Sequence, residues 1–135
     1  MPSWNASLSV GVETVDAQHQ ELLARADALL DAMRAGRSRA QVTPLLGFLR
    51  DYCREHFASE VALMRKVAYP ELEDHAAQHA SFTTRLACIE DDFQTFGPTT
   101  AIAAAVHELL CVRFVKHILE VDLAFASHLH CLTQP

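Results

Sequence analysis

Residues 56–79 read HFASEVALMRKVAYPELEDHAAQH, and they are the most informative part of the chain about its fold. It holds two pairs of side chains that commonly bind metals, each pair four residues apart: His56 with Glu60, and His75 with His79. On an α-helix, side chains four residues apart differ by only about 40° in direction, so each pair can reach one site. The stretch therefore predicts two helices that offer their ligand pairs to a shared interior.

Helix-breaking and capping residues divide the whole chain into four expected helices. Alanine and leucine abound, whereas the chain has only four glycines and five prolines, and this balance favours helix over sheet. The first helix is expected from Val12 or Ala17 to Ala35-Gly36, and the second has Pro44 in its first turn and ends at Tyr69-Pro70. The third is expected from Glu71 to Gly97-Pro98, and the fourth from Thr99 or Thr100 to about Leu129.

Apolar residues repeat every three or four positions in each stretch, which is typical of helices with one buried face. The ligand pairs of the second and third helices lie on this face. Short links imply antiparallel neighbours, so we expect an all-α, up-down-up-down antiparallel four-helix bundle with a metal site in its core, formed by residues 1–135 as a single domain. The inward series expected for the fourth helix is Ile102, Val106, Leu109 or Leu110, Arg113, His117, Val121 and Ala124.

Charge and hydropathy narrow the classes of partner. Eleven Lys and Arg against 17 Asp and Glu give a net charge of −6, which argues against a nucleic-acid or anionic-membrane surface. No apolar run approaches the roughly 18 to 20 residues that span a bilayer, and the start of the chain lacks signal-peptide regions. We therefore expect a cytoplasmic protein without membrane insertion. We also expect reduced cysteines, with Cys53, Cys88 and Cys111 as small apolar core residues.

Three further side chains join the two pairs: His19, His117 and Asp122. Either helical pair alone is more typical of surface or hydrogen-bonded histidines. Both pairs lie on apolar helix faces, however, where an uncompensated imidazole or charge would cost several kcal/mol unless metal ions bind it. His117 and Asp122 are five residues apart, an offset of about 140° on an α-helix. We expect these two side chains to diverge around the site.

Ligand chemistry limits the metal. Imidazole with carboxylate suits iron, zinc, copper or nickel, but seven ligands are too many for a single zinc ion, and structural zinc usually has cysteine ligands. Two irons bridged by Glu60 and Asp122 use all seven ligands and leave one iron with an open position. A helical bundle that holds another metal remains an alternative.

The chain resembles the hemerythrin family, specifically its single-domain bacterial members, over almost its whole length. The residues that carry the resemblance are Trp4, Val15-Asp16-Ala17-Gln18-His19, His56-Phe57-Ala58-Ser59-Glu60, Met64, Tyr69-Pro70, His75, His79, His117-Ile118 and Asp122. The resemblance implies a four-helix bundle with a non-haem di-iron centre that binds O2 reversibly. It also implies that the irons share an oxo or hydroxo bridge and the carboxylates of Glu60 and Asp122. By the same resemblance, His75, His79 and His117 bind one iron, and His19 and His56 bind the other.

The resemblance also indicates an O2 pocket. Leu22, Phe57 and Ile118 match apolar family positions that surround the O2 site, although an ordinary core role fits them equally well. Arg113 stands where the family commonly has Trp, four residues before the histidine of the last helix. We hypothesise that Arg113 lines the pocket and makes it more polar; the alternative is that its side chain extends to the surface.

The function expected from the resemblance is O2 binding for storage, transport or delivery, without catalysis. Ferritin-like di-iron oxidases use about four carboxylates, whereas this centre has two and so supplies less negative charge to the irons. This difference favours reversible O2 binding over oxidation. Expected partners are O2, small anions such as azide in the ferric state, and an unidentified O2-consuming recipient enzyme. The alternatives are an O2 or redox sensor, for which the chain offers no evident output domain, and a di-iron enzyme acting on peroxide or nitric oxide.

Overall fold

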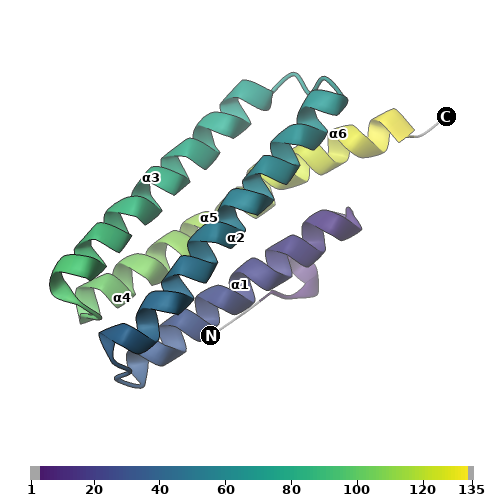
Figure 1. The fold of residues 1–135 in the computed structure, drawn as a ribbon. Helices are drawn as coiled ribbons and strands as arrows, with labels where there is room; N and C mark the ends of the chain where they lie inside the picture. Colours follow the sequence, from purple (N-terminus) through teal and green to yellow (C-terminus); the bar gives the residue numbers. More distant parts are fainter. Residues whose placement is uncertain (1–3, 134–135) are drawn as a thin grey trace.

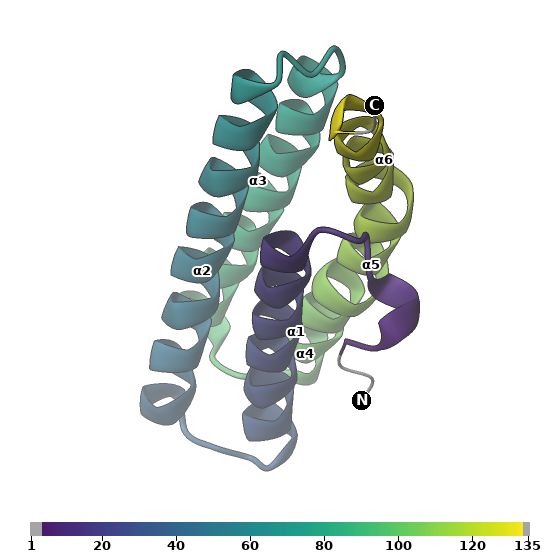
Figure 2. The same ribbon diagram turned by 90° about the vertical axis from the view of Figure 1, so that its right-hand side faces the viewer.

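Four antiparallel helical rods, joined by short links, make up the computed structural model, which describes residues 4–133 (Figure 1). The links lie at alternating ends of the rods (Figure 2), so the predicted all-α, up-down-up-down bundle is confirmed. Within the described residues, no helix has both the length and the apolar character needed to cross a bilayer. The elements are η1 (Ala6–Leu8, a 3-10 turn), α1 (Glu13–Arg34), α2 (Arg39–Lys66), α3 (Leu72–Phe96), α4 (Thr100–His107), η2 (Glu108–Arg113), α5 (Phe114–His117), η3 (Ile118–Asp122) and α6 (Leu123–Thr133).

The first three rods are the single helices α1, α2 and α3, whereas α4 to α6 form one continuous fourth rod. Thr99 caps this rod as predicted, because its side chain accepts a hydrogen bond from the backbone N–H of Ile102. Gly36 and Gly97 follow the ends of α1 and α3 with φ of 73° and 76°, a backbone conformation that glycine adopts without steric cost. These residues end the helices where the sequence predicts.

The start of α2 differs from the prediction. Ser38 and Gln41 form a reciprocal capping box, in which the Ser38 side chain accepts from the Gln41 N–H and the Gln41 side chain accepts from the Ser38 N–H. Such a box satisfies two of the backbone donors that a helix start leaves free. The helix therefore begins at Arg39, and Pro44 lies inside α2 rather than in its first turn.

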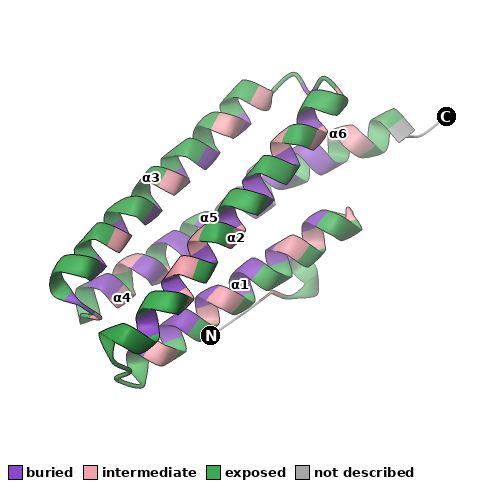
Figure 3. Cartoon of the chain, in the orientation of Figure 1, coloured by how far each residue is buried: buried purple, intermediate pink, exposed green. Residues whose placement is uncertain are grey.

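Buried residues line the inner faces of all four rods, and exposed residues cover the outside (Figure 3). The inward series of the fourth rod departs from the expected one, because Arg113 and Ala124 are exposed while Phe114, Phe125 and Ala126 are buried. The reason is that η2 and η3 are π-helical. A π-turn bonds residue i to i+5 and so takes up one more residue per turn than an α-helix. Each π-turn therefore shifts which residues face the core.

The cysteines divide between core and surface. Cys53 is buried, as expected, and Cys111 is partly buried. Cys88 is exposed, so its predicted core role is wrong. It lies next to the buried Ile89 on α3, and a neighbouring position on a helix is rotated by about 100° toward solvent.

Candidate metal centre

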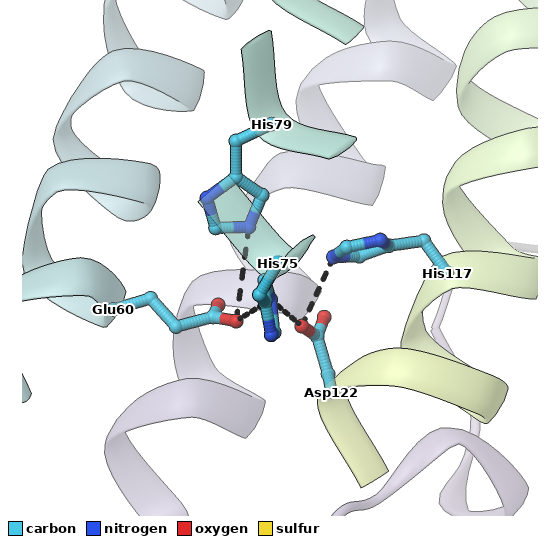
Figure 4. A group of neighbouring side chains, drawn as sticks. All are labelled: Glu60, His75, His79, His117 and Asp122. Atoms are coloured by element: carbon cyan, nitrogen blue, oxygen red, sulfur yellow. Dashed lines mark ion pairs between the residues drawn. The ribbon is translucent and has the colours of Figure 1, made fainter. Parts of the chain in front are cut away.

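The seven predicted ligand side chains come from all four rods and meet inside the bundle. Six of them are buried to 5% exposure or less, and His117 is partly buried. Figure 4 shows five of the seven, whose side chains point toward one another from α2, α3 and the fourth rod. The seven residues are His19 on α1, His56 and Glu60 on α2, His75 and His79 on α3, His117 on α5 and Asp122 on η3.

These side chains form two overlapping groups, each compact enough to hold one metal ion. In both groups the candidate ligand atoms lie within 4.8 Å of one another. Glu60 and Asp122 belong to both groups. The first group adds His75, His79 and His117 to these carboxylates, and the second adds His19 and His56.

Each shared carboxylate presents one oxygen to each group. Glu60 Oε1 lies 2.5 Å from His75 Nε2 and 3.8 Å from His79 Nε2, while Glu60 Oε2 lies 3.0 Å from His56 Nε2. A carboxylate placed in this way can bridge two cations.

Asp122 repeats the arrangement from the opposite side. Its Oδ1 lies 2.9 Å from His75 Nε2 and 3.0 Å from His117 Nε2, and its Oδ2 lies 3.0 Å from His19 Nε2. The expected divergence of His117 and Asp122 is wrong. The π-turn η3 connects them, and its i→i+5 bonding brings residues five apart onto one side of the helix.

The centre leaves many buried polar atoms without hydrogen bonds. In the described part of the chain, no hydrogen bond reaches the Nε2 atom of any of the five histidines or either oxygen of Glu60 and Asp122. Buried polar groups are normally paired, and several unpaired ones in one place call for an unseen partner. Imidazole nitrogens and carboxylate oxygens facing one another satisfy this requirement if cations lie between them. The residues present therefore fit a metal centre.

Comparison with known proteins agrees with this geometry. The family described as Hemerythrin HHE cation binding domain matches residues 10–129. The chain belongs to the hemerythrin family. Two relatives, both named Bacteriohemerythrin, illustrate the similarity. That of Stenotrophomonas maltophilia (strain R551-3) is 28% identical over 124 residues, which cover 92% of this chain and 78% of the relative. That of Pseudomonas paraeruginosa (strain DSM 24068 / PA7) is 30% identical over 91 residues, which cover 67% and 59% of the respective chains.

Electrostatics in this hemerythrin domain follow from the packing of imidazoles around carboxylates. Burial lowers the pKa of His75, but its contacts with Asp122 and Glu60 outweigh burial and raise it to about 9. Burial, followed by repulsion from His75 and His117, lowers the pKa of His79 to about 3. Burial raises the pKa of Asp122, but the surrounding imidazoles outweigh it and lower the pKa well below its usual value. An ionised Asp122 and a neutral His79 are the forms that bind metal.

Two glutamines orient two of the histidines, a role that is not among the predicted ones. His56 Nδ1 lies 2.7 Å from Gln18 Oε1, and His117 Nδ1 lies 3.1 Å from Gln78 Oε1. Because an amide oxygen only accepts, each Nδ1 carries the proton, which leaves Nε2 free to bind a metal. Each glutamine directly precedes a ligand histidine in the sequence. That repeated Gln-His pair was the available signal, although each glutamine contacts a histidine on a different helix.

The four residues predicted around the O2 site occupy two environments. Leu22 and Ile118 are completely buried in the hydrophobic core. Phe57 stacks on His79 with ring centroids 4.0 Å apart, and both Phe57 and the exposed Arg113 line a cavity of about 340 Å³. Arg113 therefore reaches the surface and borders this cavity. Whether these four residues surround bound O2 stays a prediction.

Proposed function

We propose that this chain binds O2 reversibly at a non-haem di-iron centre, in the storage, transport or delivery of O2. The observation that carries the proposal is that Glu60 and Asp122 each present one oxygen to a three-histidine group and the other oxygen to a two-histidine group. His75, His79 and His117 would hold one iron, and His19 and His56 the other. The two groups supply unequal numbers of ligands, which supports one iron with an open position.

When bound, the two ferrous ions would supply the electrons and the open coordination position that O2 binding requires, and an oxo or hydroxo ligand would complete the bridge. The protein supplies a dry and rigid surrounding. The centroid of the Phe114 ring lies 5.5 Å from that of His19 and 6.3 Å from that of His56, both in edge-to-face contacts. Both histidines are at most 1% exposed. Exclusion of water on this side favours slow autoxidation.

The composition of the centre supports binding rather than catalysis. It holds two carboxylates and five imidazoles, whereas ferritin-like di-iron proteins use about four carboxylates. Fewer anionic ligands stabilise high-valent iron less, so O2 should be released unchanged. In the ferric state, the same open position would take small anions such as azide. The recipient of the O2 would be an O2-consuming enzyme.

The test is anaerobic reconstitution with ferrous iron, followed by cycles of O2 and argon while the visible spectrum is recorded. We expect two irons per chain and a charge-transfer band that forms with O2 and disappears under argon over several cycles. Irreversible ferric formation would contradict a carrier and favour a redox sensor or an enzyme acting on peroxide or nitric oxide. Two zinc ions in the purified protein would contradict the di-iron proposal itself.

A further inference from the structure

A cavity of about 340 Å³ lies between α3 and the fourth rod, beside the metal centre but outside its metal-facing atoms. His79 and His117 both line it. Their Nε2 atoms are buried and face Glu60 and Asp122, so these nitrogens are not open to the cavity. Its volume is near the lower end of ligand pockets, roughly 300–1,000 Å³. The cavity therefore suits a small molecule that does not need to bind the metal.

One wall of the cavity is aromatic. It is lined by Phe57, Phe82 and Phe114. Phe57 stacks on His79, and its ring centroid lies 5.4 Å from that of Phe82 in an edge-to-face contact. Phe82 in turn lies 5.6 Å from Phe114. These rings hold one another in place and offer a rigid apolar surface to a flat or short-chain group.

The rim of the cavity is polar and carries an excess of positive charge. Arg113 and Lys116 line it with a single acidic residue, Glu120. The chain as a whole has 17 acidic residues against 11 basic ones, so this local excess runs against the overall charge. Arg113 and Lys116 are exposed, and their positive charge favours an anion at the mouth. A guanidinium can also bind a carboxylate with two parallel hydrogen bonds.

We propose that this cavity binds a small amphipathic carboxylate, with its apolar part on the wall of Phe57, Phe82 and Phe114 and its carboxylate on Arg113 and Lys116. Phe57 and Arg113 are also among the residues predicted around O2, but the carboxylate would bind at the rim of this cavity and not at the open position of an iron. The π-turn η2 helps to create this site, because the register shift buries Phe114 in the wall and leaves the adjacent Arg113 at the rim.

The test is isothermal titration of the metal-loaded protein with benzoate, and with benzylamine as a cation of similar size and shape. We expect saturable binding of benzoate and none of benzylamine. Arg113→Gln should weaken benzoate binding about tenfold, the usual effect of losing a charge-assisted hydrogen bond. Arg65→Gln, an exposed change at the C-terminal end of α2 and outside the lining of the cavity, should have no effect. Thermal unfolding of each variant checks that the fold is retained.

Three results would overturn the proposal. One is the absence of benzoate binding at millimolar concentration. Another is equal binding of benzoate and benzylamine, since the cationic rim would then have no role. The third is an unchanged benzoate affinity in Arg113→Gln together with complete loss of binding in excess azide, which would place the carboxylate on the metal. None of these results depends on whether O2 binds, so the two proposals fail separately.

Discussion

Two regions of the bundle bring an imidazole to a carboxylate by different helix geometries. On the regular helix α2, His56 and Glu60 are four residues apart, and on the fourth rod His117 and Asp122 are five apart across the π-turn η3. In both pairs the Nε2 to oxygen distance is 3.0 Å. The comparison teaches that the same contact can be built at two spacings, provided that the helix changes its hydrogen bonding to match.

The strongest test of this comparison gives α2 the spacing of the fourth rod. Inserting one alanine between Ala58 and Ser59 places His56 and Glu60 five apart. Unless α2 forms a π-turn, every later residue rotates by about 100°, so Glu60 and Met64 leave the core. We expect loss of metal from both groups, because both share Glu60, and a decrease of at least about 3 kcal/mol in the free energy of unfolding.

Metal analysis and urea unfolding followed by circular dichroism measure these effects. The matched control inserts alanine after Gly36, in the link between α1 and α2, where an extra residue changes no helix face. If the α2 insertion bound two metals as tightly as the parent protein, the regular geometry of α2 would not be required.

Gln18 and Gln78 allow the α2 site and the fourth-rod site to be compared without changing a metal ligand. Gln18→Ala removes the acceptor of the His56 Nδ1 proton, and Gln78→Ala removes that of His117. Loss of such a partner typically weakens metal binding about 10- to 100-fold. We expect Gln18→Ala to have the larger effect, because its contact is shorter and partly buried, whereas that of Gln78 is exposed.

Competition with a chromophoric chelator measures both metal affinities. Gln18→Glu and Gln78→Glu are the matched controls, since each keeps an acceptor oxygen and should restore most of the affinity. Equal weakening by the two alanine variants would show that exposure of the contact has no influence.

The converse change gives the fourth rod the spacing of α2. Deleting Leu119, which is 45% exposed, places His117 four residues before the aspartate. Because a π-turn is an α-turn with one extra residue, the η3 segment should become a regular α-helix, and the residues before and after it should keep their present orientation toward the core. We expect retained metal and a change of about 1 kcal/mol or less in the free energy of unfolding.

Deletion of Ala58 is the matched comparison, because it also removes one exposed residue between two ligands but acts on a helix without a π-turn. It should abolish metal binding. Comparable damage from both deletions would mean that η3 is needed for a reason other than register.

The same contrast explains what could be predicted from the sequence. In a regular helix, the apolar residues of the buried face repeat every three or four positions, so the core positions of α3 were predictable. Its end was predictable from Gly97. A π-turn interrupts this repeat without a sequence signal of its own. The regular repeat therefore predicts that Arg113 faces the core, whereas the buried residue is its neighbour Phe114. The five-residue spacing of His117 and Asp122 was the one clue. The repeated Gln-His pair was a signal for Gln18 and Gln78, but the histidine that each contacts was not predictable, since it depends on how two rods pack.

The smallest expected effect is a difference in the reaction rates of two thiols. It measures how readily a regular helix and a π-turn open locally. Cys53 lies on the regular α2, where burial raises its pKa to about 12. At pH 8 only about one in ten thousand such thiols is ionised and reactive. Cys111 lies in the π-turn η2, is less buried, and has a pKa raised chiefly by burial. With iodoacetamide at pH 8, mapped by mass spectrometry over time, the exposed Cys88 and Cys131 should react first, then Cys111, and Cys53 only after unfolding. Equal rates for Cys53 and Cys111 would mean that α2 opens as readily as η2, and the contrast between regular and π-helical regions would then be limited to geometry.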